Sequence, residues 1–177
     1  MVRTIDRKPV PRAAPQSAAR IIESGSLDIT TLVAAVEGRL DEDAFPVTLS
    51  GPQWQTLASA MQRRELRPGD LLLRCGEAAA RAFFVERGQL QVYVTRGHRA
   101  TTLHAGAVVG EAGLFGAAPC TAYVEAVTRC VVWELAAARL QALASTAPEL
   151  VAEVLRAAGV VLALRQRAQR ERGIPLA

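Results

Sequence analysis

Apolar residues follow a helical rhythm near both ends of the chain and a strand-like rhythm between them. Residues 28–40, DITTLVAAVEGRL, have apolar side chains three and four positions apart, which predicts an amphipathic helix with Asp28 as its N-cap. A second short helix is predicted over about residues 52–60, because Ser50 is a good N-cap and Pro52 suits the first turn. The apolar stripe of the first helix is Leu32, Val33, Val36 and Leu40, and that of the second is Trp54, Leu57 and Met61.

From residue 62 the pattern becomes one of short strands separated by glycine turns. The turn signals are Pro68-Gly69, Gly76, Gly88, Gly97 and Gly106. Between them residues 89–95 alternate, which predicts Leu90, Val92 and Val94 on one face and Gln89, Gln91 and Tyr93 on the other. Residues 121–136 predict two further strands that meet near residues 128–129. Evenly spaced short strands of this kind are typical of a compact barrel or sandwich.

After residue 136 the helical rhythm returns. A short helix is predicted over 136–144, and a longer one from Pro148 with apolar residues at i, i+3, i+4 and i+7. We therefore divide the chain into a flexible basic tail (1–27), an N-terminal helical segment (28–61), a strand-rich body (62–135) and C-terminal helices (136–172).

The net charge of +4 comes from the two ends of the chain. Residues 1–20 have a net charge of +4 and residues 165–177 one of +3, so residues 21–164 have a net charge of −3. The folded body therefore offers no basic surface to a nucleic acid, and we expect no direct DNA binding. We interpret the arginines of 165–172 as a solvated helix end, with an acidic partner or a lipid headgroup as the alternative.

The cysteines and the absence of a long apolar run indicate a cytoplasmic protein. Cys75, Cys120 and Cys130 are odd in number and widely spaced, which fits free thiols in a reducing compartment. The N-terminus has no apolar stretch of the secretory type, and no run of about 18 apolar residues could span a membrane. The arginine- and alanine-rich composition with a single lysine indicates a GC-rich bacterial gene.

The segment GEAGLFGAAPCTAYV, residues 110–124, has the features of an anion cradle. A helical turn after Gly110 would point unpaired backbone N–H groups at a ligand, and Gly110 would let the backbone approach that ligand closely. Glu111 also has a purely structural interpretation, because a carboxylate at the start of a helical turn stabilises it through the dipole.

Four quoted segments together resemble the cyclic nucleotide-binding domain of catabolite-activator-type regulators, kinase regulatory subunits and some channels. They are LRPGDLLLRCG (66–76), FFVERGQLQV (83–92), LHAGAVVGE (103–111) and the cradle GEAGLFGAAPCTAYV (110–124). The resemblance covers about residues 50–170. It implies a mainly β fold, an eight-stranded antiparallel β-roll of jelly-roll type with flanking helices, and a phosphate-binding cassette over residues 110–121.

The resemblance also implies a set of ligand contacts. Gly110, Glu111, Ala112, Cys120 and Thr121 take the positions of the family's ligand-binding residues. Glu111 would accept a hydrogen bond from a ribose 2′-hydroxyl, and Thr121 would donate one to an exocyclic oxygen.

Cys120 departs from the family pattern, since the family has an arginine there that neutralises the cyclic phosphate. Losing such a charge-assisted hydrogen bond lowers the affinity for the ligand by about 10- to 100-fold. Arg81 and Arg129 are the other cations near strand ends. Residues 151–164 offer only Glu153 and Arg156 as polar groups to a base. The Cys120 thiol is either reactive, with a pKa lowered by the cradle, or part of a small residue that replaced the arginine once ligand binding was lost.

Two functions remain open. The first is a regulatory sensor that binds a cyclic nucleotide, or a cyclic dinucleotide, weakly or in an altered way and acts on a partner protein. The second is a degenerate pocket in a protein-interaction or dimerisation module, with a homodimer formed through the helix over 148–170. We expect no winged helix-turn-helix, no metal site and no cofactor. We also expect no enzyme, because His98, His104 and the scattered acids do not assemble a catalytic pair.

Overall fold

The computed structural model describes residues 20–21, 28–41, 44–94, 101–116 and 118–171. Its helices are α1 (Thr30–Glu37), α2 (Gly51–Ser59), α3 (Ala137–Ala142) and α4 (Pro148–Glu171), with 3-10 helices η1 (Glu111–Leu114) and η2 (Leu143–Ser145). Its strands are β1 (Arg20–Ile21), β2 (Met61–Leu66), β3 (Leu71–Leu73), β4 (Ala78–Ala79), β5 (Arg81–Arg87), β6 (Leu90–Tyr93), β7 (Thr101–Leu103), β8 (Val108–Val109), β9 (Ala118–Pro119), β10 (Tyr123–Ala126) and β11 (Cys130–Ala136). The tail predicted for residues 1–27 lies outside the described residues apart from β1, which pairs with β2.

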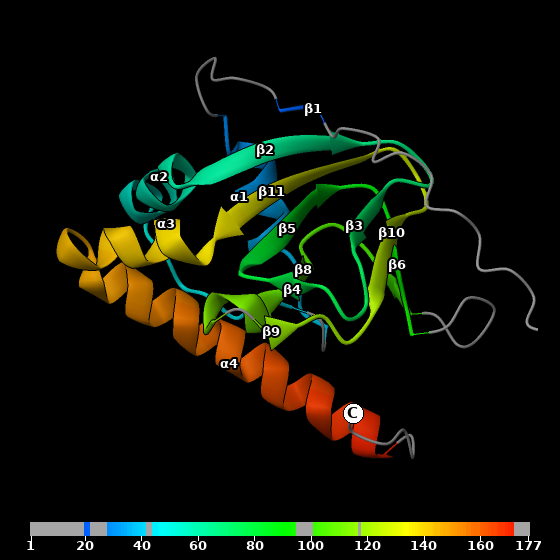
Figure 1. The fold of residues 1–177 in the computed structure, drawn as a ribbon. Coiled ribbons are helices and arrows are strands. Elements are labelled where there is room, and N and C mark those ends of the chain that lie inside the picture. Colours follow the sequence, from blue (N-terminus) through cyan, green and yellow to red (C-terminus); the bar gives the residue numbers. More distant parts are fainter. Residues whose placement is uncertain (1–19, 22–27, 42–43, 95–100, 117, 172–177) are drawn as a thin grey trace, which may run out of the picture.

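Two antiparallel sheets form the body of the molecule (Figure 1). The first has the strand order β1-β2-β11-β5-β8, and the second has the order β3-β10-β6-β7. The short strands β4 and β9 form a separate pair, which the sequence pattern did not predict. Helices α2 and α3 lie at one end of the body, and α4 runs along the side that carries β4 and β9 (Figure 1). This arrangement confirms the predicted antiparallel β-roll with flanking helices.

Strands β5 and β11 are buried on both faces, which explains their continuous apolar sequences. One face of each strand joins the helix-side core, a buried cluster that includes Leu57, Phe84, Trp133, Leu140 and Val154. The opposite face joins the roll core between the two sheets, a buried cluster of Leu66, Leu73, Phe83, Val85, Leu90, Leu103, Ala107, Val109, Val124, Ala126, Cys130 and Val132. Successive residues of one strand therefore enter different cores.

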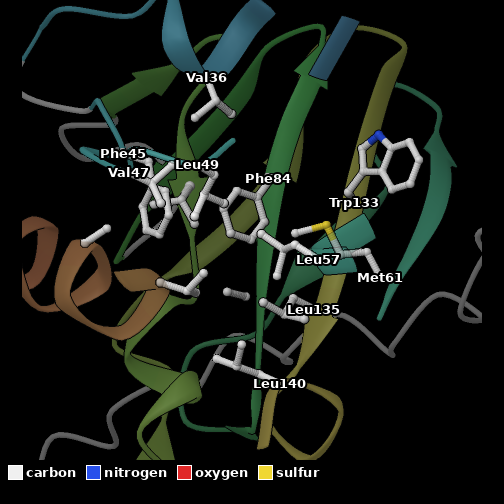
Figure 2. Close-up of a cluster of buried hydrophobic side chains, with 14 of the residues drawn as sticks. Val36, Phe45, Val47, Leu49, Leu57, Met61, Phe84, Trp133, Leu135 and Leu140 are labelled. Carbon is white, nitrogen blue, oxygen red and sulfur yellow. The ribbon is translucent and has the colours of Figure 1, made fainter. Parts of the chain in front are cut away.

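The helix-side core is filled by large side chains from the sheet, the helices and the segment before α2 (Figure 2). Phe45 meets Phe84 edge to face, with ring centroids 5.1 Å apart. Trp133 is fully buried, and its Nε1 donates a hydrogen bond to Glu86 Oε2 at 2.6 Å. The buried indole N–H is thus paired, as a buried polar group requires.

The N-terminal helices follow their predicted signals with one exception. Ser50 and Gln53 form a reciprocal capping box at the start of α2. At α1 the N-cap is Ile29, and Asp28 Oδ1 instead accepts a hydrogen bond from the Thr30 N–H at 3.0 Å. Because α1 ends at Glu37, Leu40 leaves the predicted apolar stripe and is 94% exposed.

Helix α4 begins at Pro148, as the pattern predicts, and its buried stripe consists of Leu150, Val154, Ala157, Ala158 and Val161. Near its start Glu153 accepts a hydrogen bond from the Thr48 N–H at 3.0 Å, and Arg156 donates to the Pro46 carbonyl at 2.6 Å. Arg156 also pairs with Glu153 at 2.7 Å. These contacts fix the first half of α4 to residues 46–48. Among the described helices, none is both long and apolar enough to cross a membrane.

Candidate ligand-binding site

Gly110 starts the predicted cradle in a left-handed conformation. It has φ +73° and is the N-cap of η1. A Cβ at this position would lie 2.8 Å from the carbonyl oxygen of Arg81 on β5. Glycine is therefore required both by the backbone conformation and by close packing of the cradle on β5. The sequence had predicted a different reason, close approach to a ligand.

Glu111, the first residue of η1, is buried with 5% exposure. Its Oε1 accepts a hydrogen bond from Arg165 Nη1 on α4 at 2.7 Å. Arg165 Nη2 donates a second hydrogen bond to the Val108 carbonyl at 2.8 Å. The carboxylate is thus paired inside the protein, and the pair joins the cradle to the C-terminal helix.

A cavity of about 380 Å³ opens between the cradle, the second sheet and α4. Its lining contains all five residues that the sequence singled out, Gly110, Glu111, Ala112, Cys120 and Thr121. Ala112 and Thr121 are exposed, whereas Cys120 is half-buried. The remaining wall is mostly apolar and includes Leu73, Val92, Leu103, Val109, Val124 and Leu162. A concave apolar site with a few convergent polar groups is the usual form of a small-molecule pocket.

Thr101 on β7 is a further hydroxyl in the cavity wall that sequence reasoning missed. The polar groups that the sequence offered on the helix for a base, Glu153 and Arg156, do not line the cavity. They hold α4 to residues 46–48 instead. The hydroxyls available to a ligand therefore come from the strand side and the cradle.

Cys120 brings no positive charge to the cradle. Its backbone N–H donates to the Glu77 carbonyl at 2.9 Å, and its carbonyl accepts from the Gly76 N–H at 2.8 Å, so the position is fixed by main-chain pairing. Burial raises the pKa of the Cys120 thiol, and the neighbouring Cys75 thiol and Glu77 carboxylate raise it further, outweighing the lowering by Arg81. Of the two interpretations of this thiol, the raised pKa contradicts the reactive one, and the thiol is neutral at pH 7.

The other two thiols differ from each other in burial. Cys130 is fully buried, as the strand pattern predicts, and burial raises its pKa. Cys75 is only half-buried, because it lies in the turn after β3 rather than within a strand.

Neither arginine that the sequence offered as a counter-charge lines the cavity. Arg81 Nη1 pairs with Glu134 Oε1 at 3.2 Å, and Arg129 is exposed in the turn between β10 and β11. Among the described residues, the cation that does line it is Arg165, which the sequence had placed in a solvated helix end. The signal was present, because Val154, Ala158 and Val161 form a buried stripe, and the half-buried Arg165 is the next position at the same helical spacing.

The structure gives no support to a histidine metal site. His104 is exposed and does not line the cavity, and His98 lies outside the described residues. Within the described part of the chain, no group of three histidine, cysteine or acidic residues is placed to hold a metal ion.

Residues 63–147 match the family model described as the cyclic nucleotide-binding domain. This segment contains the whole cradle and most of both sheets. Residues 63–147 therefore belong to the cyclic nucleotide-binding domain family, which confirms the resemblance seen in the motifs. Arg165 lies beyond the matched segment.

Curated relatives include an uncharacterized NTE family protein of Mycobacterium tuberculosis, which is 29% identical over 105 residues. That match covers 59% of this chain and 18% of the relative. The cAMP-dependent protein kinase type II regulatory subunit of Drosophila melanogaster is 31% identical over 88 residues, covering 50% of this chain and 23% of that protein. The matches thus span about a fifth of the relatives' own length.

A solved structure with the same fold is that of a cyclic nucleotide-binding domain from Methylobacillus flagellatus. It superposes with a TM-score of 0.67 at 20% identity and covers 84% of this chain and 86% of that one. At this identity the likeness shows the fold alone, and it extends beyond the segment that the family model matches.

Proposed function

We propose that this protein is a regulatory sensor module that binds a cyclic nucleotide in the cavity and acts on a partner protein. The observation that carries the proposal is the cavity of about 380 Å³ that the cradle, the apolar sheet wall and α4 enclose. A relict pocket filled by side chains would not leave such a space. The family membership of residues 63–147 supports the same class of ligand.

The chemistry of the lining suits a nucleoside with one anionic group. The apolar wall favours a base, Thr121 and Thr101 supply hydroxyls, and Glu111 can accept a hydrogen bond from a ribose hydroxyl. Cys120 in place of the family's arginine weakens phosphate binding by about 10- to 100-fold relative to a site that has the arginine. The proposed ligand affinity is therefore lower than the fold alone suggests, or the ligand is an altered one such as a cyclic dinucleotide.

The test is calorimetric titration of the full chain with cyclic AMP, cyclic GMP and cyclic di-GMP, with Cys120→Arg measured beside the natural protein. We expect binding of at least one ligand, and tighter binding by Cys120→Arg, with the full gain of about 10- to 100-fold requiring that no other cation neutralises the phosphate. In the Cys120→Arg background, where position 120 neutralises the phosphate, Glu111→Ala should weaken binding, because the acceptor for the ribose hydroxyl is removed. Binding by Cys120→Arg alone, with none by the natural protein, would refute the sensor function.

A second function is favoured by exposed apolar side chains beside the cavity. Val160 and Leu164, one helical turn apart on α4, are 36% and 40% exposed, and Phe115 at the end of η1 is 56% exposed. Apolar groups on adjacent turns of one helix suit an interface with another helix. Sedimentation equilibrium of the natural protein and of Val160→Glu distinguishes the two functions. A dimerisation module predicts a dimer that Val160→Glu dissociates, whereas the sensor function predicts no change in assembly.

A further inference from the structure

We propose that Arg165 on α4 supplies the positive charge that holds the ligand's phosphate in this pocket, in place of the arginine absent at position 120. This inference rests on the proposed function and names a binding residue for it. Arg165 lies beyond the segment that the family model matches, and no motif of the cradle includes it.

The charged residues of the cavity wall point to Arg165 as the phosphate-binding cation. Among the described residues of the cavity wall, Glu111 and Arg165 are the charged ones, and they pair with each other at 2.7 Å. Without Arg165 the described lining would keep one buried negative charge, which would repel a phosphate. With Arg165 the lining is neutral, and the anion has one cation to bind.

The geometry also places this cation where an anion would arrive. Arg165 Nη2 donates a hydrogen bond to the carbonyl of Val108, two residues before Gly110. Its Nη1 donates to the carboxylate of Glu111, the residue after Gly110. Its guanidinium therefore lies against the start of η1, in the wall of the cavity. A guanidinium presents several donors in one plane, so it can hold a carboxylate and a phosphate oxygen together or exchange one for the other.

Arg81 is the competing candidate, because its charge is felt at the Cys120 thiol. However, Arg81 Nη1 pairs with the buried Glu134 carboxylate at 3.2 Å, and its side chain is not part of the cavity wall. Moving it to the ligand would remove one of the two arginines that pair with the buried Glu134 in the described structure, leaving Arg64. The two arginines therefore make different predictions for the same titration.

The test is a double-mutant cycle by calorimetry on the full chain with cyclic AMP and cyclic GMP as probes. Arg165→Gln should weaken binding by about 10- to 100-fold in the natural background. In the Cys120→Arg background the same change should weaken binding by less than about 3-fold, because position 120 then neutralises the phosphate. Adenosine, which has no phosphate, should bind the natural protein and Arg165→Gln equally.

Three variants serve as controls. Arg167→Gln makes the same chemical change two residues further along α4, on an exposed side chain outside the cavity, and should leave affinity unchanged. Arg81→Gln should also leave it unchanged. Arg165→Lys keeps a charge beside Glu111 but loses the planar fork, so it should fold normally and lose part of the affinity. Thermal unfolding of each variant shows whether the fold is intact.

Each alternative result would overturn the inference in a recognisable way. Equal binding by Arg165→Gln and the natural protein leaves the sensor function standing but removes Arg165 from the phosphate site. Tighter binding by Arg165→Gln would make Arg165 a group that blocks the ligand. Equal losses in both backgrounds, or for adenosine as well, would assign it a structural role. Absence of binding by the natural protein would remove the sensor function itself.

Discussion

The two faces of the first sheet are packed in different ways. The helix-side core interlocks large side chains such as Phe84 and Trp133, and helices close it on the outer side (Figure 2). The roll core is built from smaller residues, mostly valine, leucine and alanine, and part of its wall, including Leu73, Val92 and Val124, faces the cavity. The comparison shows that one face of the sheet is closed by large side chains, while the core on the other face borders an open cavity.

The largest effect should come from emptying the helix-side core. Trp133→Ala removes a fully buried indole and its hydrogen bond to Glu86, which keeps only its longer contact with Arg63 at 3.6 Å among its described partners, so it should lower the free energy of unfolding by about 3–5 kcal/mol. Val92→Ala, on the cavity wall, should cost about 1 kcal/mol or less, because that side chain already borders open space. Chemical denaturation of both variants measures the difference, and equal losses would show that the two faces are packed alike.

An intermediate effect is expected at the boundary between the two regions. Gly110→Ala places a Cβ 2.8 Å from the Arg81 carbonyl and also strains a residue with φ +73°. Gly69→Ala is the matched control, since φ there is +90° but nothing lies within 4 Å of the added Cβ. The control should lose about 1–2 kcal/mol from the backbone conformation alone. Gly110→Ala should lose about 1–3 kcal/mol more from overpacking, and equal losses would contradict the close packing of the cradle on β5.

The smallest effect concerns the fixed half of α4. Hydrogen bonds from Arg156 and from the Thr48 N–H lower the pKa of Glu153 from 4.5 to about 2. A lowered pKa in the folded state means that the contribution is full above pH 4.5 and is lost as the pH falls towards 2. Glu153→Gln should therefore lower Tm by about 1–3 °C at neutral pH, and this difference should shrink on acidification. A difference that is constant with pH would contradict the ionised contact.

The sequence correctly predicted elements in which buried residues repeat at a regular spacing. The prediction failed where tertiary packing interrupts that spacing. The stripe of α4 from Val154 to Val161 was predicted because a helix repeats regularly. The alternation of residues 89–95 held for Leu90, Gln91 and Val92, since Leu90 and Val92 face the roll core and Gln91 is exposed, and it failed from Tyr93 on. Tyr93 is buried because it stacks on Tyr123 and its hydroxyl donates to Glu125, while Val94 lies past the end of β6 and is 61% exposed.

The residues of the candidate site also divide into those that the sequence identified and those that it missed. The cradle residues from Gly110 to Thr121 were identified because they are contiguous in sequence and carry a motif. Arg165 joins them from 54 positions beyond Glu111, through a contact that only the docking of α4 creates. The helical spacing places Arg165 on the same face of α4 as Val161, but it does not show that this face meets the cradle.

Helix α4 has its two attachments far apart, and this gives it the geometry of a lever. Glu153 and Arg156 fix its first half to residues 46–48, while Arg165 ties its second half to the cradle. From Glu153 to the end of the helix at Glu171 the axis extends about 27 Å. Rotation by about 10° about the first attachment would move the far end by about 5 Å. A change of partner at a single guanidinium would thus be magnified mechanically along the helix.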